Sequence, residues 1–467
     1  MIASFLQDTD FINALYIVAF SLFVIGIAGL TGPRTAVRGN RIAAVGMAIA
    51  VVATLLYEQI GDWELIALGI VLGTLVGVPA ARNVKMTQMP QMVALFNGVG
   101  GGAVALIAWS EFRTNDGDIS QLEFGIPLVF AAIVGSISFW GSNIAFAKLQ
   151  ELISGRPLKI PGGVFLNLAL IAIAIGCGIA LLAGSDDEIL FIALLVSAAI
   201  VGNTFVLPIG GADMPVVIST LNAFTGLSAA AAGLALDNIA LIVAGMIVGA
   251  SGTILTQQMA EAMNRTIVSV LLGGFGGEAP AAAGPEGATG GTVRSTSAAD
   301  AAIQMAYARQ VVVVPGYGMA VAQAQHAVRE LGKALEGRGV EVKFGIHPVA
   351  GRMPGHMNVL LAEADVPYDQ LKEMDEINGE FGRTDVSLVI GANDVTNPDA
   401  RSKPESPIYG MPILNVDESQ SVIVLKRSMS SGYAGIDNPL FVNPKTSMLF
   451  GDAKASVASI TEELKVL

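Results

Sequence analysis

The chain has 467 residues and a formal net charge of −13, and 53% of its residues are hydrophobic while only 14% are charged. Soluble globular proteins carry about a quarter charged residues, so this composition excludes an ordinary soluble protein and indicates one largely embedded in a membrane. The acidic balance argues against a nucleic-acid partner, and the single cysteine, Cys177, excludes an internal disulfide.

Apolar runs fill the first 275 residues, and each is close to the roughly 20 residues that cross a bilayer. The first run lacks a basic segment before it, so we expect a retained helix rather than a cleaved signal. The nine expected spans are 11–30, 41–59, 63–81, 90–110, 124–147, 163–183, 188–208, 215–235 and 238–259.

Basic residues follow the odd-numbered spans, and acidic residues follow the even-numbered ones. Arg34 and Arg38 follow the first span, for example, whereas Asp186 and Asp187 follow the sixth. Positive residues accumulate on the cytoplasmic side of a membrane. We therefore expect a multi-pass membrane protein with its N-terminus outside and its C-terminal part in the cytoplasm.

Three polar residues stand in the expected spans. Asp213 begins the eighth span, where it fits either a helix N-cap or a proton-handling carboxylate. Asn222 lies nine residues further on, about 13 Å deeper by helical rise, and Asn97 is similarly central in the fourth span. Two amides at matching depth suggest a shared hydrated path, although a buried Asn also simply ties helices together. The small residues around Ser251 predict close helix packing.

Residues 276–299 are rich in Ala, Gly and Pro and predict a flexible linker. Residues 300–467 have the alternating pattern of a Rossmann-like, doubly wound α/β domain. We expect strands at 310–314, 340–344, 386–390, 412–416 and 421–425, and helices at 319–336 and 452–466. The histidines all lie in this part, so a bis-His haem in the membrane part is excluded.

A glycine turn follows the first of these strands, in Val-Val-Val-Val-Pro-Gly316-Tyr-Gly318. Glycines between a strand and a helix let the backbone approach a pyrophosphate, which predicts a dinucleotide site, with an ordinary tight turn as the alternative. No carboxylate ends the second strand, whereas Lys426, Arg427 and Ser428 end a later one. Such a set suits the 2′-phosphate of NADP, or is simply a pair of solvated charges.

Further loops are expected where ligands gather in such a sheet. In the first of these loops Arg352 is a candidate phosphate clamp, and in the second Asp394 is a candidate ribose or amide contact. Residues 431–435 are expected to form a lid. His347 and His356 lie near the site without metal-ligand spacing, and His326 is expected at the surface.

Taken together, these residues resemble the beta subunit of proton-translocating NAD(P) transhydrogenase over essentially the whole chain. The segments that carry the resemblance are Gly-Gly-Ala-Asp213-Met-Pro-Val-Val, Ala262-Met-Asn-Arg265, Pro315-Gly-Tyr-Gly-Met-Ala-Val-Ala-Gln-Ala-Gln, Phe344-Gly-Ile-His-Pro-Val-Ala-Gly-Arg-Met-Pro-Gly-His, Gly391-Ala-Asn-Asp, Lys426-Arg-Ser-Met and Gly451-Asp-Ala-Lys-Ala-Ser.

The resemblance implies hydride transfer from NADH to NADP+, driven by protons moving inward, with no catalytic side chain and no metal. It implies NADP(H) in this chain and NAD(H) in a companion alpha subunit, in a dimer of alpha-beta units. The implied NADP(H) contacts are Gly316, Tyr317, Gly318, Val349, Ala350, Gly351, Arg352, Met353, Pro354, Gly391, Ala392, Asn393, Asp394, Val395, Gly410, Met411, Lys426, Arg427, Ser428, Met429, Ser430, Ser431, Gly432, Tyr433, Asp452 and Ala453. The implied proton path or coupling region comprises Asp213, Asn222, Asn97, Ser251, Gly252 and Arg265.

Asn97 is a departure from the family, because some members carry a protonatable His at this place. The resemblance then leaves Asp213, water or a His of the companion subunit to carry the proton. A different class of function, a channel or transporter gated by a nucleotide-sensing domain, fits the two-part chain as well, but no carbonyl-filter motif such as Thr-Val-Gly-Tyr-Gly is present.

Overall fold

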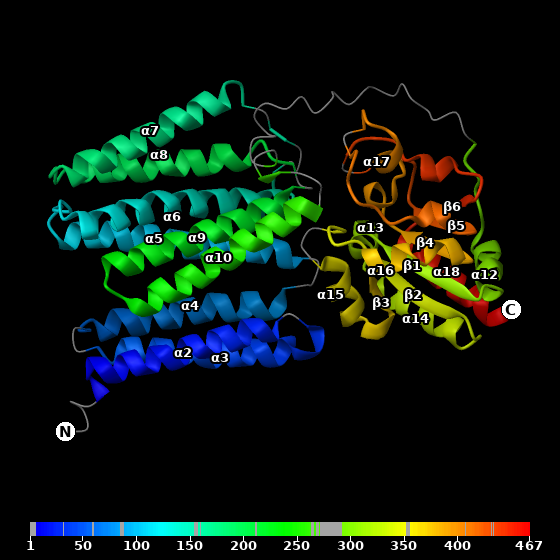
Figure 1. The fold of residues 1–467 in the computed structure, drawn as a ribbon, viewed down its shortest axis with the longest axis horizontal. Helices are drawn as coiled ribbons and strands as arrows, with labels where there is room; N and C mark the ends of the chain where they lie inside the picture. Colours follow the sequence, from blue (N-terminus) through cyan, green and yellow to red (C-terminus); the bar gives the residue numbers. More distant parts are fainter. Residues whose placement is uncertain are drawn as a thin grey trace.

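The structure is a computed structural model with an N-terminal bundle of long helices and a C-terminal α/β domain (Figure 1). It describes residues 6–30, 32–57, 60–84, 88–153, 157–158, 160–210, 213–262, 266–267, 270, 292–351, 355–406, 408–430, 432 and 434–467.

The bundle contains, within the described ranges, nine helices long and apolar enough to cross a bilayer, as the sequence predicts. Each agrees with an expected span to within a few residues, except that α3 begins eight residues early. They are α2 (Thr9–Gly29), α3 (Pro33–Leu55), α4 (Trp63–Asn83), α5 (Met89–Thr114), α6 (Leu122–Leu149), α7 (Gly163–Leu182), α8 (Glu188–Val206), α9 (Met214–Ala235) and α10 (Ile239–Ala262).

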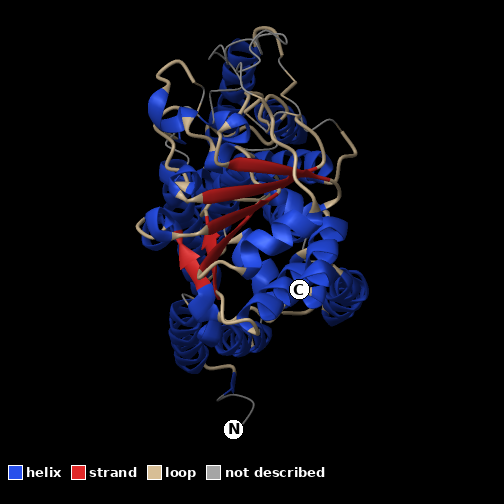
Figure 2. Cartoon of the chain, turned by 90° about the vertical axis from the view of Figure 1, so that its right-hand side faces the viewer, coloured by secondary structure: helices blue, strands red, loops and turns tan. Residues whose placement is uncertain are grey.

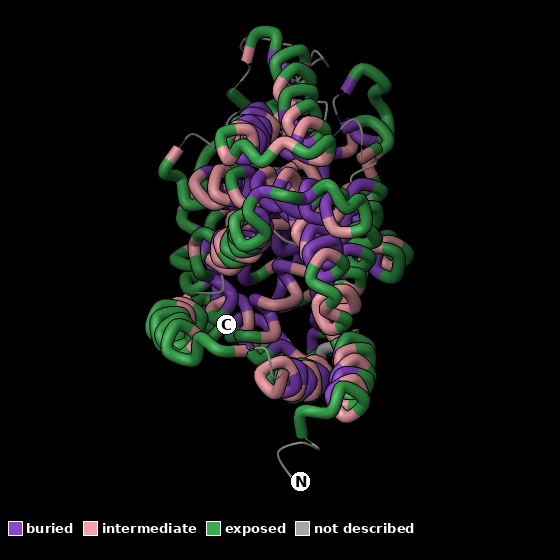
Figure 3. The backbone as a smooth tube through the Cα atoms, turned by 90° about the vertical axis from the view of Figure 1, so that its left-hand side faces the viewer, coloured by how far each residue is buried: buried purple, intermediate pink, exposed green. Residues whose placement is uncertain are grey.

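Helix α9 lies at the centre of the bundle. In the most apolar stretch of α9, 72% of the residues are buried, whereas no residue of the corresponding stretch of α4 is buried. It packs against α5, α6 and α10, and Figure 3 shows buried segments in the middle of the bundle with exposed helices around them. The exposed apolar side chains of these outer helices form the surface that a bilayer would cover, because exposing so much apolar surface to water would be unfavourable.

The C-terminal domain is built on a six-stranded parallel sheet in the order β3-β2-β1-β4-β5-β6 (Figure 2). This is the doubly wound order, with its reversal point between β1 and β4, and it confirms the predicted Rossmann-like class. The strands are β1 (Gln310–Pro315), β2 (Glu341–Ile346), β3 (Leu371–Glu373), β4 (Val386–Ile390), β5 (Ser421–Lys426) and β6 (Thr446–Phe450).

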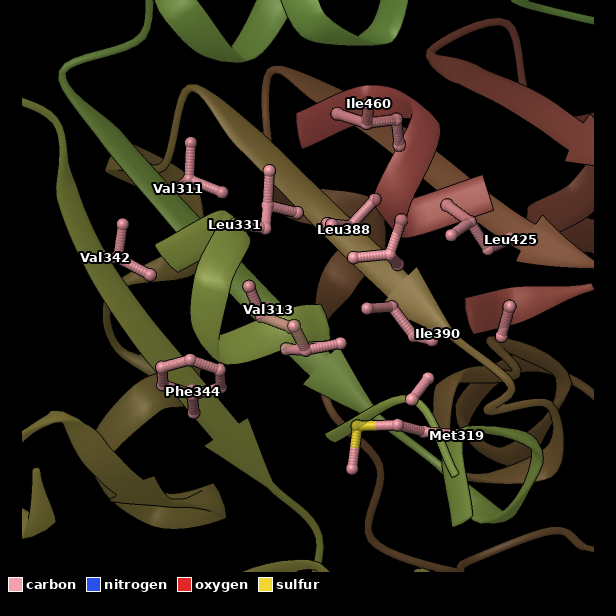
Figure 4. Packing of buried hydrophobic residues seen from close by; sticks show 14 of the residues in the cluster. Val311, Val313, Met319, Leu331, Val342, Phe344, Leu388, Ile390, Leu425 and Ile460 are labelled. Atoms are coloured by element: carbon pink, nitrogen blue, oxygen red, sulfur yellow. The ribbon is translucent and has the colours of Figure 1, made fainter. Parts of the chain in front are cut away.

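Both faces of the sheet are covered, which is why its central strands β1, β4 and β5 are nearly continuous apolar runs rather than alternating ones. On one face Val311, Val313 and Leu388 pack against Leu331 and Ile460, side chains of the helices over that face (Figure 4). The covering helices there are α12 (Ala298–Ala306), α13 (Tyr317–Val321), α14 (Gln325–Glu336), α15 (His356–Glu363) and α18 (Ala453–Val466).

Shorter elements cover the other face, where they contribute to a second apolar cluster around Val312 and Val424. They are α16 (Met374–Asn378) and the 3-10 turns η3 (Phe381–Arg383), η4 (Asp394–Thr396), η5 (Val416–Glu418) and η6 (Pro439–Val442). Two more short elements lie outside this cluster: α17 (Asp399–Ser402), whose Ala400 packs with Ile408 and Ile413, and the 3-10 turn η2 (Tyr368–Gln370) before β3.

Two predicted elements are wrong. Residues 412–416 form no strand. Instead, Leu414 lies in a loop and Val416 begins the 3-10 turn η5, and both side chains are buried in the apolar cluster against the sheet, which explains their apolar pattern. The expected helix 319–336 is two helices, because Gln323 adopts a left-handed conformation with φ of 49° between α13 and α14. The short edge strands β3 and β6 were not predicted.

Residues 276–291 of the predicted linker lie outside the described residues. Just before α12 the chain runs beside β6, since the Thr296 amide donates to the Met448 carbonyl over 2.9 Å and the Met448 amide donates to the Arg294 carbonyl over 2.7 Å. The extent of the linker, 276–299, stays a prediction.

Candidate nucleotide site and membrane polar layer

A cavity of about 870 Å³ opens at the carboxyl ends of β1, β4 and β5. This is the place where doubly wound sheets bind their ligands, and the volume lies in the range of small-molecule sites. The lining residues are Pro215, Met259, Gly316, Tyr317, Gly318, Val321, Ala322, Pro348, Val349, Ala350, Gly351, Gly391, Ala392, Asn393, Asp394, Val395, Met411, Leu425, Lys426, Arg427, Ser428, Ser430, Gly432, Gly451, Asp452 and Ala453.

Gly316 and Gly318 lie in the loop after β1 and connect it to the loop after β4. The Gly316 amide donates to the Ile390 carbonyl over 2.8 Å, and the Gly318 amide donates to the Gly391 carbonyl over 3.0 Å. A Cβ on Gly316 would lie 2.4 Å from the Cα of Ala392, and one on Gly318 would lie 2.7 Å from the Cα of Gly391. The glycines therefore serve the contact between the two loops. The helix that follows is only the five-residue α13 rather than the long helix expected at 319–336.

Lys426 ends β5 with its ammonium group partly buried in the cavity wall. Its Nζ donates to the Ser430 carbonyl and lies 5.1 Å from the centre of the Phe441 ring. Burial lowers the pKa of Lys426, and the nearby carboxylates of Asp394 and Asp437 oppose that shift. Arg427 and Ser428 are exposed at the rim. The end of β5 thus presents two cationic groups and hydroxyls to the opening.

The loop after β5 folds back over Asp394. The Ala434 amide donates to Asp394 Oδ2 over 3.0 Å, and a Cβ on Gly432 would lie 2.4 Å from Asp394 Oδ1. Asn438 Nδ2 donates to the carbonyl of the neighbouring Asn393 over 3.0 Å. The expected lid is therefore fixed at its base to the loop after β4.

His347 holds the loop after β2. Its Nε2 lies 2.8 Å from the Pro412 carbonyl, and its Nδ1 accepts from the Val349 amide over 3.3 Å. Burial lowers the pKa of His347, while the bond to Pro412 opposes this. Acceptance at Nδ1 and donation at Nε2 define a neutral imidazole, so His347 is a structural residue. His356 is also buried and His326 is exposed.

Most of the predicted NADP(H) contacts come together in this one cavity. Met429 is exposed outside it, and Gly410 lines a neighbouring cavity that shares Met411. Arg352, Met353, Pro354, Ser431 and Tyr433 lie outside the described residues. Within the described ranges, no group of three or more His, Cys, Asp or Glu side chains is arranged to hold a metal ion.

Two lining residues belong to the helix bundle and were not anticipated. Pro215 stands in the first turn of α9, and Met259 stands near the C-terminal end of α10. Contacts between a bundle and a domain that are far apart in sequence leave no local pattern, so only the three-dimensional structure reveals them. The cavity is therefore walled on one side by the ends of the central membrane helices.

Asn97 belongs to a hydrogen-bonded polar layer that joins three helices. Its Nδ2 donates to Ser142 Oγ over 2.9 Å and lies 3.4 Å from Ser138 Oγ. Ser138 in turn lies 2.5 Å from Thr225 Oγ1, and both hydroxyls reach the Leu221 carbonyl over 3.0 Å. Helices α5, α6 and α9 are thus linked through this layer. The spacing of Ser138 and Ser142, one helical turn apart in an apolar span, is the sequence signal for it.

The other predicted proton-path residues have different surroundings. Asp213 occupies the N-cap position of α9 without a side-chain capping hydrogen bond, and its role in proton handling stays a prediction. Asn222 is half-buried on α9. Ser251 is exposed and donates to the Val248 carbonyl of its own helix over 3.1 Å. Gly252 is buried, and its carbonyl accepts from Ser219 Oγ over 3.1 Å, which joins α10 to α9. Arg265 lies outside the described residues.

Comparison with known proteins places this geometry in a family. A family model described as NAD(P) transhydrogenase beta subunit matches residues 12–463. Two relatives named NAD(P) transhydrogenase subunit beta, one from Rhodospirillum rubrum and one from a named strain of that species, are each 48% identical to the chain over 457 residues. The alignments cover 97% of this chain and 98% of each relative.

Proposed function

The chain belongs to the NAD(P) transhydrogenase beta subunit family, so it is a membrane subunit of a proton-translocating transhydrogenase, and we propose that its own C-terminal domain binds NADP(H). The contact of the cavity with both the sheet and the bundle carries this proposal. Pro215 and Met259 of the bundle line the same cavity as Gly316 and Lys426, so a nucleotide bound there touches both parts of the chain.

Selection of NADP(H) over NAD(H) rests on the end of β5. Lys426, Arg427 and Ser428 supply charged and hydroxyl donors that suit a 2′-phosphate. The strand β2 is followed by His347 and Pro348 rather than by the acidic residue that a ribose 2′-hydroxyl prefers. Asp394, fixed by the Ala434 amide, is placed to accept hydrogen bonds from the nucleotide.

NADP(H), when bound, supplies the nicotinamide ring that accepts or gives up the hydride. The chain's own residues hold the nucleotide, orient it and exclude water, and no side chain needs to act as an acid or nucleophile. NAD(H) then binds a companion alpha subunit, which brings the second nicotinamide to the opening. We expect the assembly to be a dimer of alpha-beta units in a bacterial inner membrane, with the α/β domain in the cytoplasm.

Proton movement is assigned to the bundle, residues 1–275, and nucleotide binding to residues 300–467. Asp213 lies two residues before Pro215 in the cavity wall, and Asn97 lies in the polar layer of α5, α6 and α9. Asn97 does not titrate, so its amide orients hydroxyls or water, while Asp213 is the ionisable group of the bundle that stands two residues from the cavity wall. Asn222, Ser251, Gly252 and Arg265 complete the proposed path and coupling region.

The test is reconstitution of the chain with its alpha partner in sealed vesicles. NADH and NADP+ are added, and NADPH formation and the internal pH are followed together. We expect hydride transfer accompanied by a pH gradient that a protonophore abolishes. Transfer without any gradient would contradict the coupling, and NADP+ binding without transfer would indicate a gated channel or transporter instead.

A further inference from the structure

Lys148 is a buried cation that neither the nucleotide cavity nor the proposed proton path uses. It stands in the last turn of α6, and only 2% of its surface is exposed. Burying an ammonium group is costly unless it is hydrogen-bonded, and ionisable residues inside membrane bundles commonly have a function.

Two hydrogen bonds of Lys148 reach the end of the neighbouring helix α8. Its Nζ donates to the Leu207 carbonyl over 2.5 Å and to the Ile209 carbonyl over 2.8 Å. Leu207 is the C-cap of α8, where free carbonyls and the negative end of the helix dipole favour a cation. Two bonds spaced two residues apart fix both the position and the direction of the chain as it leaves α8.

The described residues that follow in the chain, 207–210 and 213–215, lie between these two bonds and the nucleotide cavity. Ile209 and Met214 pack in one apolar cluster with Ala145 and Leu149 of α6. Asp213 follows, and its amide donates to the Gly210 carbonyl over 3.2 Å. Pro215 then forms part of the cavity wall. One short stretch of chain thus joins Lys148, Asp213 and the proposed NADP(H) site.

We propose that Lys148 is a positioning residue for energy coupling. By holding the carbonyls of Leu207 and Ile209, it fixes the chain ahead of α9, so that a change at the nucleotide cavity is transmitted to Asp213 and a change at Asp213 is transmitted to the cavity. This inference rests on the proposed function of the cavity and of Asp213. Lys148 does not contact the reacting nucleotides. Its loss should leave the binding and hydride chemistry in place while the connection between nucleotide and proton site becomes loose.

Lys148→Met tests this, because methionine fills the same apolar space without a donor or a charge. The variant and its alpha partner are reconstituted in vesicles, and hydride transfer is measured with and without an imposed proton gradient. We expect the acceleration by the gradient to fall by about tenfold, within the usual range for coupling between two sites. The protons moved per hydride should fall too, while transfer in detergent stays within about twofold of the wild type.

Two further substitutions separate positioning from general stability. Lys148→Arg keeps the charge and several donors, so it should restore most of the acceleration by the gradient. Ser136→Ala removes a buried bond between the same helices, from Ser136 Oγ to the Leu195 carbonyl over 2.9 Å, far along α8 from residues 207–215. We expect normal coupling in this control. If Lys148→Met accumulates poorly, Lys148→Gln, one atom shorter and unable to reach both carbonyls, should show the same loss.

The outcomes are distinct. The first outcome assumes a wild type that transfers hydride and moves protons. If Lys148→Met, or Lys148→Gln in its place, then moves the same number of protons per hydride and is accelerated equally by the gradient, the inference is overturned. Equal losses in Lys148→Met and Ser136→Ala would also overturn it, because they would indicate general destabilisation. If the wild type itself shows no NADP(H)-dependent transfer, the proposed function fails instead.

Discussion

The amide of Gly318 donates a 3.0 Å hydrogen bond to the carbonyl of Gly391, so the loops after β1 and β4 are joined backbone to backbone at the reversal point of the sheet. The two loops line the same cavity. Their close approach makes the shape of the proposed NADP(H) site depend on the absence of side chains at these positions.

Gly318→Ala should therefore weaken NADP(H) binding and destabilise the domain. The new Cβ would lie 2.7 Å from the Cα of Gly391, and overpacking of this kind costs about 1–3 kcal/mol. Calorimetric titration with NADP+ and a denaturation midpoint measure the two effects. Gly332→Ala on α14 is the matched control, because its Cβ would meet nothing closer than 3.8 Å. Unchanged NADP+ affinity in Gly318→Ala would contradict the role given to this contact.

Arg427→Met should reduce affinity for NADP+ much more than affinity for NAD+. Its side chain is exposed at the rim of the cavity, so its loss should not affect folding. A hydrogen bond to a charged group is worth about 1.5–3 kcal/mol, which corresponds to roughly a tenfold to hundredfold change. Lys454→Met, an exposed cation on α18 outside the cavity, serves as the control. Equal losses for the two nucleotides would exclude a 2′-phosphate contact at Arg427.

Asp213→Asn should abolish coupled proton movement without unfolding the bundle. The Asp213 side chain makes no capping bond to α9, so the substitution removes a titrating group rather than a helix cap. Proton uptake into vesicles and the thermal midpoint in detergent are the measurements. A variant that still moves protons at the normal rate would refute the assignment of Asp213.

Ser138→Ala should slow coupled transfer by breaking the polar layer. Ser138 contacts both Asn97 and Thr225, so its hydroxyl is the link between α5 and α9. The gradient-driven rate should fall while transfer in detergent is preserved. Ser197→Ala is a suitable control, because Ser197 is a buried hydroxyl that bonds only within its own helix, to the Leu194 carbonyl. If both variants behave alike, the layer has no special role.

Glu380 makes the domain sensitive to acid. Burial would raise its pKa, but hydrogen bonds from Lys343, Gln310 and Arg383 outweigh burial and lower it from 4.5 to about 2. A lowered carboxyl pKa stabilises the fold above the unfolded value, and this contribution disappears as the pH falls from 4.5 toward 2.

We expect the wild type to lose more stability across this range than Glu380→Gln, which has no carboxylate to protonate. Pulsed hydrogen exchange of β1 and β2 across a urea series, in the full chain, measures the difference. Parallel pH dependence in the two proteins would show that the Lys343–Glu380 pair, 2.7 Å apart, does not contribute in this way.

Sequence patterns predicted the membrane helices and the main strands because both are apolar runs of characteristic length. Residues 412–416 have the apolar pattern of a strand because Leu414 and Val416 are buried against the sheet. An apolar pattern reports burial, but it does not show whether the backbone forms the hydrogen bonds of a strand. The break between α13 and α14 was missed because the residue with the left-handed conformation there is Gln323, and no Gly or Pro marks the end of a helix at this place. The strand β3 has three residues and is only partly buried, so its pattern is too short to recognise.

For the candidate site, motifs predicted which loops gather at the sheet edge, because doubly wound topology brings strand ends together. Contacts made by Pro215, Met259 and Lys148 depend on how the bundle meets the domain and how its helices end. They were missed because no short-range pattern encodes them.

The shared wall formed by Pro215 and Met259 has a thermodynamic consequence for the proposed enzyme. When two ligands act on one protein, the factor by which the first changes the affinity for the second equals the factor in the opposite direction. Protonation of the bundle and occupancy of the cavity must obey this reciprocity. The shift that NADP+ binding causes in the proton affinity of the membrane part therefore equals, as a free energy, the shift that protonation causes in NADP+ affinity, and each can be determined by measuring the other.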